Sequence, residues 1–227
     1  MAIAILDIDG TLVDTNYQHA LAWFRALARF DLIVPIWRIH RHTGMGGDQI
    51  VSALCGEEIE RELGGRVRAA HDEEYGRMIG EVRTVAGARE LILALGDRGH
   101  RTVLASSANK AEVDHYLELL DAREIVAGWT TSADVEATKP APDLVHAARK
   151  RAGASPNEPA VMVGDTPWDV RAALAADVGT LAVITGGFSE QELREAGALD
   201  VFESVAQLTD ALDRTPLGRD AHSSAAR

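Results

Sequence analysis

The sequence lacks most features that mark secreted, membrane-bound or nucleic-acid-binding proteins. Its one cysteine, Cys55, cannot form an internal disulfide and has no second cysteine with which to share a metal ion. The formal charge of -12, with no basic stripe, argues against nucleic acid or an anionic membrane as a partner. No apolar run reaches membrane-spanning length, and the first residues do not have the order of a signal peptide. We therefore expect a cytoplasmic protein. If its ligand is anionic, a few positively charged groups at the binding site must bind it.

The sequence does contain a regular alternation of strand and helix patterns. Strands are predicted at residues 2–7, 101–106, 128–131, 160–164 and 180–184, and helices at 87–97, 109–120, 142–151, 167–176, 190–195 and 205–212. This alternation predicts an α/β fold, a Rossmann-like doubly wound parallel sheet with helices on both faces. Ligands of such sheets bind beyond the carboxyl ends of the strands.

Residues 16–83 interrupt the alternation, because they contain helical stretches and no convincing strand. Helices are predicted at 17–30, 36–42, 48–54 and 57–82, the last broken or loosened at Gly64-Gly65. The chain thus divides into a core, residues 1–15 and 84–214, and a helical insertion, residues 16–83. Residues 215–227 have no apolar period, and we predict that they form a disordered tail.

Two carboxylates, Asp7 and Asp9, stand where the first predicted strand ends, and Gly10 follows them. Side chains alternate along a strand, so both carboxylates project to the same side. Like charges this close persist if a cation lies between them or if one carboxyl holds a proton. Either condition suits phosphoryl transfer through an aspartyl-phosphate. A turn after a strand would explain an isolated Asp-Gly pair equally well.

Four segments, in order, are similar to the motifs of the haloacid dehalogenase superfamily. They are DIDGTLVDT at 7–15, a strand ending at Ser106-Ser107, KPAPD at 139–143 and GDTPWD at 164–169. The resemblance covers nearly all residues to about 213. The insertion at 16–83 resembles the small cap domain of the branch that contains phosphoglycolate phosphatases and β-phosphoglucomutases.

The resemblance implies a role for each motif residue. Asp7 would be the nucleophile that forms an aspartyl-phosphate. Asp9 would give a proton to the leaving oxygen and later take one from water, which suits a carboxyl with a raised pKa. Lys139 and the Ser106 hydroxyl would hold phosphoryl oxygens, and the Ser107 amide would add to them.

The resemblance also implies a magnesium site formed by Asp7, the backbone carbonyl of Asp9 and Asp165, because magnesium prefers oxygen ligands. Asp169 has a structural explanation as well. With Thr166 as N-cap and Pro167 at the first helical position, it falls where a capping box needs an acid. We assign Asp169 to a supporting position, where it orders a metal-bound water or Lys139.

Substrate specificity should come from the insertion. His19 stands where relatives in this superfamily carry a histidine after the first motif, and Arg41 lies in a basic segment before a glycine-rich loop. Together with Gly10, they are our candidates for further substrate contacts. A solvated arginine paired with one of the chain's many acids explains Arg41 at least as well.

The pattern favours a magnesium-dependent phosphatase acting on a small phosphorylated metabolite, similar to phosphoglycolate or a sugar phosphate. Two alternatives stay open, a sugar-phosphate mutase similar to β-phosphoglucomutase and a non-catalytic protein that binds metal or phosphate. In β-phosphoglucomutases an arginine follows a glycine of the cap domain by three positions. The residue at the corresponding position of this sequence is Gly47. Residues 16–83 contain no lysine, and the phosphonoacetaldehyde hydrolases of this superfamily need one there. Neither the physiological substrate nor the oligomeric state follows from the sequence.

Overall fold

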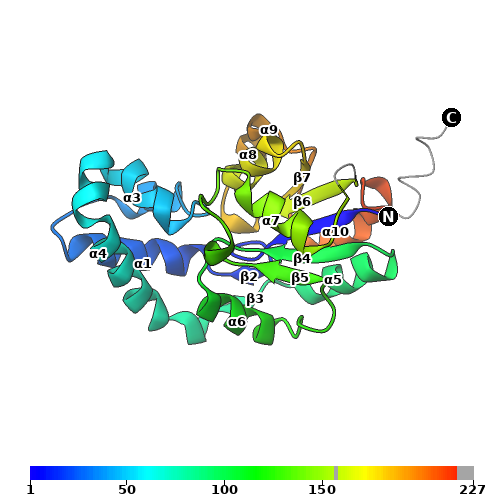
Figure 1. The fold of residues 1–227 in the computed structure, drawn as a ribbon, viewed down its shortest axis with the longest axis horizontal. Helices are drawn as coiled ribbons and strands as arrows, with labels where there is room; N and C mark the ends of the chain where they lie inside the picture. The colour runs from blue at the N-terminus through cyan, green and yellow to red at the C-terminus, as the bar shows by residue number, and fades with distance from the viewer. Residues whose placement is uncertain (156–157, 219–227) are drawn as a thin grey trace.

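A six-stranded parallel sheet lies at the centre of the computed structural model, which describes residues 1–155 and 158–218 (Figure 1). In spatial order its strands are β5 (Gly128–Thr130), β4 (Arg101–Ala105), β1 (Ile3–Asp7), β6 (Ala160–Gly164), β7 (Gly179–Val183) and β8 (Asp200–Phe202). The strand order runs outward from β1 in both directions, which confirms the predicted doubly wound α/β fold. The prediction missed β8, because three residues are too short to show an alternating pattern.

Helices cover both faces of this sheet (Figure 1). One face packs against α5 (Ala88–Asp97), α6 (Lys110–Leu119) and α10 (Val205–Ala211), and the other against α7 (Asp143–Arg151) and α8 (Pro167–Ala175), with α9 (Glu190–Ala196) beside α8 and β8. Along β1, Ala4 and Leu6 join the first core cluster, whereas Ile3 and Ile5 join the second. Burial on both faces explains why this strand reads as a continuous apolar run. None of the helices in the described ranges has the length and apolar character needed to cross a membrane.

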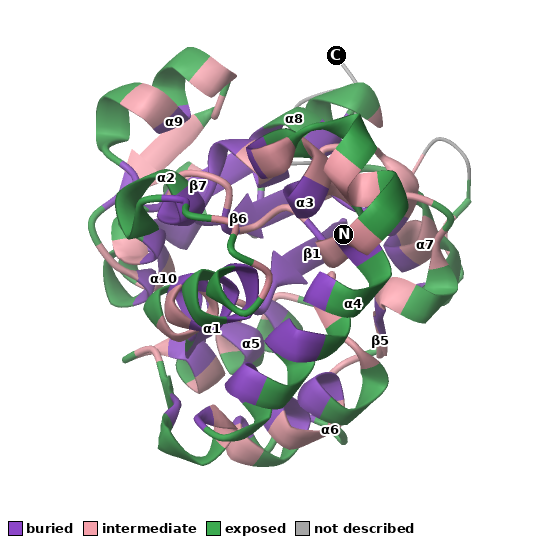
Figure 2. Ribbon diagram, turned by 90° about the vertical axis from the view of Figure 1, so that its left-hand side faces the viewer, coloured by how far each residue is buried: buried purple, intermediate pink, exposed green. Residues whose placement is uncertain are grey.

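Four further helices form a lobe beyond the sheet, at the left of Figure 1. We call this lobe the cap. It consists of α1 (Asn16–Ala28), α2 (Ile36–His40), α3 (Gly47–Cys55) and α4 (Glu57–Gly76), and its apolar side chains form a cluster of their own. Viewed from the cap side, the buried strands β1 and β6 lie behind helices whose outer turns are exposed (Figure 2).

The predicted break at Gly64-Gly65 is wrong, because α4 continues through both glycines. Gly64 is buried, and a Cβ there would lie 2.5 Å from the Glu60 carboxylate. Glu60 in turn is ion-paired with Arg68, one turn beyond the glycines, at 2.8 Å. This ion pair spans Gly64 and links the two halves of the helix, a side-chain contact that the helix propensities of single residues do not contain.

A short antiparallel pair marks the two junctions between the cap and the core. Val13 and Asp14 (β2, Val13–Asp14) pair with Thr84 and Arg83 (β3, Arg83–Thr84). These strands were not predicted, because two residues carry no periodic signal. They place the entry and exit of the cap side by side, as a two-stranded connection to the sheet.

The start of the predicted disordered tail is ordered. Leu217 is fully buried in the larger core cluster, and its carbonyl oxygen lies 2.9 Å from Nε2 of His100. The prediction of disorder is therefore wrong for residues 215–218, where a single apolar residue is enough to dock the chain. The rest of the predicted tail, residues 219–227, lies outside the described residues.

Candidate active site

Four charged side chains from distant parts of the chain meet at the carboxyl end of the sheet. Asp7 ends β1, Asp165 follows β6, Asp169 lies in the first turn of α8, and Lys139 comes from the loop between β5 and α7. Nζ of Lys139 lies 2.5 Å from Oδ1 of Asp7 and 2.7 Å from Oδ1 of Asp169. All four side chains are buried. The parallel topology thus brings three separate sequence motifs to one point.

The carboxylates of this cluster fit a divalent metal ion. One oxygen each from Asp7, Asp165 and Asp169 lies within 4.8 Å of the others. Oδ2 of Asp7 is buried and has no hydrogen-bond partner among the described residues. Burial and the charge of Asp169 raise the pKa of Asp7, and they raise the pKa of Asp165 to about 7. A magnesium ion would offset this crowding of negative charge.

Asp165 is held in place by the segment that follows β1. Oγ1 of Thr11 donates a hydrogen bond to Oδ1 of Asp165 at 2.6 Å, and Nδ2 of Asn16 donates to its Oδ2 at 2.8 Å. Gly10 makes this approach possible, because a Cβ there would lie 2.3 Å from Oδ2 of Asp165. The Gly10 amide donates to the Val13 carbonyl, and Gly10 is not among the described residues that line the pocket. The structure therefore places Gly10 in a turn beside Asp165, and its contact with substrate stays a prediction.

Asp169 makes the predicted capping box at the start of α8. Its Oδ2 accepts hydrogen bonds from the backbone N–H of Thr166 at 3.0 Å and from Oγ1 of Thr166 at 2.7 Å. The other oxygen, Oδ1, contacts Lys139, as described above. Asp169 therefore both caps the start of α8 and holds the side chain of Lys139 in its orientation.

Asp9 is surrounded by hydrogen-bond donors. Oγ of Ser106 lies 2.9 Å from its Oδ2, whereas Oγ1 of Thr15 and Nε2 of His19 lie 3.0 and 3.3 Å from its Oδ1. Burial raises the pKa of Asp9, but these hydrogen bonds together bring it below its usual value. The expectation of a raised pKa is therefore wrong for this arrangement. The pKa of His19 is raised by Asp9 despite burial, so the proton of this pair lies on the imidazole.

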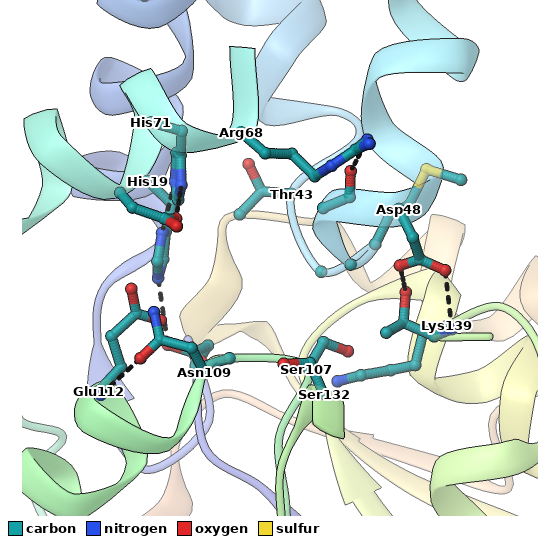
Figure 3. A pocket seen from close by; sticks show the side chains of 18 of the residues that line it. His19, Thr43, Asp48, Arg68, His71, Ser107, Asn109, Glu112, Ser132 and Lys139 are labelled. Atoms are coloured by element: carbon teal, nitrogen blue, oxygen red, sulfur yellow. Dashed lines mark hydrogen bonds and ion pairs between the residues drawn. The ribbon is translucent and has the colours of Figure 1, made fainter. Parts of the chain in front are cut away.

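A pocket of about 330 Å³ lies between the cap and the core (Figure 3). Of the predicted site residues, Asp9, His19, Ser107 and Lys139 line it. Ser106 lies beside it, where its hydroxyl holds Asp9. The cap and the core also supply lining residues that sequence reasoning did not single out, among them Asp48, Arg68, His71, Asp72, Asn109 and Glu112.

Comparison with known proteins agrees with this geometry. A family model described as a haloacid dehalogenase-like hydrolase matches residues 1–177. The chain belongs to this family. A phosphoglycolate phosphatase of Rhodospirillum rubrum is 31% identical to this hydrolase over 226 residues, which is 95% of this chain and 92% of the relative.

Two other relatives support the same assignment. Pyrophosphatase PpaX of Bacillus velezensis is 28% identical over 189 residues, 79% of this chain and 81% of the relative. The crystal structure of a hydrolase from Pseudomonas syringae is 33% identical and superposes with a TM-score of 0.88, covering 94% of this chain and 99% of that one.

In this hydrolase a chain of hydrogen bonds leads from Asp9 into the cap. Nδ1 of His19 lies 3.2 Å from Nε2 of His71, and Nδ1 of His71 lies 3.2 Å from Oδ1 of Asp72. Burial lowers the pKa of His71 to about 4, so this imidazole is neutral. A neutral His71 that donates to Asp72 accepts a hydrogen bond from His19. His71 and Asp72 were missed because α4 reads as a polar surface helix.

The cap loop before α3 lies directly on the loop that carries Lys139. Asp48 accepts hydrogen bonds from the backbone N–H of Thr138, at 3.1 Å, and from its hydroxyl. At Gly46 a Cβ would lie 1.9 Å from Oγ1 of Thr138, so the close approach depends on glycine. The glycine-rich loop of the cap thus closes one side of the pocket.

Arg41 lies outside this pocket. Its guanidinium forms an ion pair with Glu192 of α9 and lies 4.1 Å from the centre of the Phe188 ring. It is not among the described residues that line the pocket. The structure therefore places Arg41 against an acid of the core, the alternative that the sequence left open, and not at the substrate position.

We expect Arg41→Ala to change KM by less than about threefold, because Arg41 lies outside the pocket and the loss of its partly exposed ion pair lowers the folding stability by only about 0–1 kcal/mol. Steady-state kinetics on an aryl phosphate and on the preferred metabolite would test this, with Glu192→Gln as the matched variant. An increase in KM of tenfold or more on the metabolite alone would show that Arg41 contacts the substrate.

Proposed function

We propose that this hydrolase is a magnesium-dependent phosphatase that cleaves a small phosphomonoester through an aspartyl-phosphate on Asp7. The observation that carries the proposal is the set of contacts around the Asp7 carboxylate. One of its oxygens is held by Lys139, and the other is buried without a partner among the described residues. Relatives named phosphoglycolate phosphatase and pyrophosphatase support phosphate chemistry.

In the first step an Asp7 oxygen attacks phosphorus, and the bond between phosphorus and the ester oxygen breaks. Lys139 offsets the charge of Asp7 and of a phosphoryl oxygen. A magnesium ion held by Asp7, Asp165 and the Asp9 carbonyl would supply further positive charge beside the phosphoryl group. The departing oxygen takes a proton from Asp9, which receives it from the hydrogen-bonded His19.

In the second step water attacks the aspartyl-phosphate, and the carboxylate of Asp9 accepts the proton of that water. The bond between Asp7 and phosphorus breaks, which releases inorganic phosphate and restores the Asp7 carboxylate. The hydrogen bonds of Ser106 and Thr15 keep Asp9 facing the site in both steps. The cap limits the access of bulk water to the intermediate.

A sugar-phosphate mutase is the main alternative, and the cap argues against it. A mutase must hold a second phosphate, yet position 47 is a glycine. The neighbouring Arg68 packs over Gly47, with its Cδ 3.3 Å from where a Cβ would be, and pairs with Glu60. Gly47 therefore has no side chain that could bind a second phosphate.

With magnesium, we expect glucose 1-phosphate to give inorganic phosphate or no product, and a hexose bisphosphate not to stimulate isomerisation. Phosphorus NMR of the reaction, beside a panel of phosphorylated metabolites, would measure both outcomes. Bisphosphate-dependent formation of glucose 6-phosphate would instead establish a mutase. Binding of panel members without any turnover would support a non-catalytic protein.

A further inference from the structure

Apart from Lys139, the side chains that line the pocket include more acidic than basic groups. Asp48, Asp72, Glu112 and Glu136 line the pocket, and Arg68 supplies the one guanidinium among its described lining residues. Figure 3 shows Glu112 and Lys139 at opposite ends, with Arg68 above them on the cap side. A phosphoryl group beside Lys139 would therefore direct its leaving group toward an acidic wall.

Arg68 does little to offset this acidity. Its Nη1 lies 2.8 and 2.9 Å from the two carboxylate oxygens of Glu60, and 3.1 Å from the carbonyl oxygen of Gly47. The guanidinium is thus neutralised by an acid of its own helix. A second anionic group on the substrate would have to displace this pairing.

Glu112, at the start of α6, is the unusual member of this wall. Its side chain lines the pocket with only 7% of the residue exposed. Its carboxylate accepts a hydrogen bond from the backbone N–H of Asn109 and forms no ion pair among the described residues. Burial raises the pKa of Glu112 to about 7 although the charge of His19 lowers it, and the charges of Asp9 and Asp72 add to the rise. An ionised carboxylate has about four acceptor positions, so one backbone donor leaves most of them open to a ligand in the pocket.

Two hydroxyl groups in the same pocket lack hydrogen-bond partners among the described residues. Oγ1 of Thr43, in the cap, and Oγ of Ser107, in the core, are buried without a hydrogen bond among the described residues. Thr43 is only 4% exposed. Each hydroxyl can both donate and accept, and an ionised carboxylate can only accept. The unpaired atoms of the wall therefore match the hydroxyl groups of an alcohol better than a carboxylate or a phosphate.

We propose that Glu112 is a specificity-determining residue that accepts hydrogen bonds from an uncharged, hydroxyl-bearing leaving group and disfavours leaving groups with a second negative charge. Thr43 and Ser107 complete the hydrogen bonds to that group. This inference rests on the proposed phosphatase function and narrows its substrate class to phosphates of small polyhydroxylated alcohols. The volume of about 330 Å³ is at the small end of ligand pockets, which suits such a group.

The test compares kcat/KM for glycerol and hexose phosphates with kcat/KM for 2-phosphoglycolate and pyrophosphate. The assay uses excess magnesium at about pH 8, above the pKa of Glu112. For the unmodified protein we expect the polyol phosphates to be preferred by at least tenfold. Glu112→Gln keeps the size of the side chain and removes its charge. It should reduce this preference by roughly tenfold, the effect of one charge-assisted hydrogen bond or one like-charge contact.

Glu118→Gln, on the exposed side of the same helix, is the matched control and should leave the preference unchanged. If Glu112→Gln does not fold, Asp72→Asn removes another pocket carboxylate from an exposed position and should shift the preference in the same direction. A preference for phosphoglycolate or pyrophosphate that neither variant changes would overturn the role of Glu112 while leaving the phosphatase intact. Failure to release phosphate from any substrate, aryl phosphates included, would instead overturn the proposed function.

Discussion

Asp7→Asn should lower kcat by at least about four orders of magnitude, because an amide cannot replace the carboxylate as the nucleophile. The substitution preserves the shape of the side chain and removes one charge from a crowded group of buried carboxylates. Lys139 keeps its contact with Asp169. We therefore expect the variant to fold, with a melting temperature no lower than that of the unmodified protein.

Two measurements separate loss of the nucleophile from loss of the fold. A rapid quench with labelled substrate should trap phosphate on the unmodified protein and none on Asp7→Asn. The melting temperature reports the fold, and Asp97→Asn, at the exposed end of α5, is the control for an Asp-to-Asn exchange far from the site. Labelled phosphate on Asp7→Asn would show that a different residue accepts the phosphoryl group.

Removal of divalent metal should abolish activity, and added magnesium should restore it. Burial and mutual repulsion leave Asp7 and Asp165 with raised pKa values, so a cation between them is strongly favoured. Because a ligand that binds only the folded protein stabilises it, magnesium should also raise the melting temperature. At a concentration one hundred times the Kd, the stabilisation would be about 2.7 kcal/mol.

Phosphate release and melting curves in chelator, and then in excess magnesium, measure both effects. In Asp165→Asn the magnesium-dependent shift in melting temperature should be lost, because the variant lacks one ligand and the negative charge of that ligand. Asp97→Asn changes an exposed carboxylate at the end of α5, far from the cluster, and should keep the shift. Full activity in chelator would rule out the metal site.

Much of the fold could be predicted, because its main elements carry their own local patterns. The strands that end at Asp7 and Gly164 are continuous apolar runs, since the sheet is covered on both faces. The elements that were missed are short: β2 and β3 have two residues each and β8 has three. Their pairing is decided by neighbouring segments and not by any periodicity. The docking of Leu217 is likewise a long-range contact.

The sequence by itself determined that Asp7, Ser106 and Asp165 stand at strand ends, and a parallel sheet necessarily gathers such ends on one rim. It also determined the Asp169 capping box, because the spacing from Thr166 to Asp169 is a local property of one helical turn.

Only the tertiary structure decided the rest of the site. The way the cap lies on the core decides three properties of the site. They are the low pKa of Asp9, the position of Arg41 outside the pocket, and the presence of His71 and Glu112 in the pocket lining. Each of these properties is set by contacts between residues far apart in the chain. Their strength depends on distance and burial, which no spacing within a single helix or strand encodes.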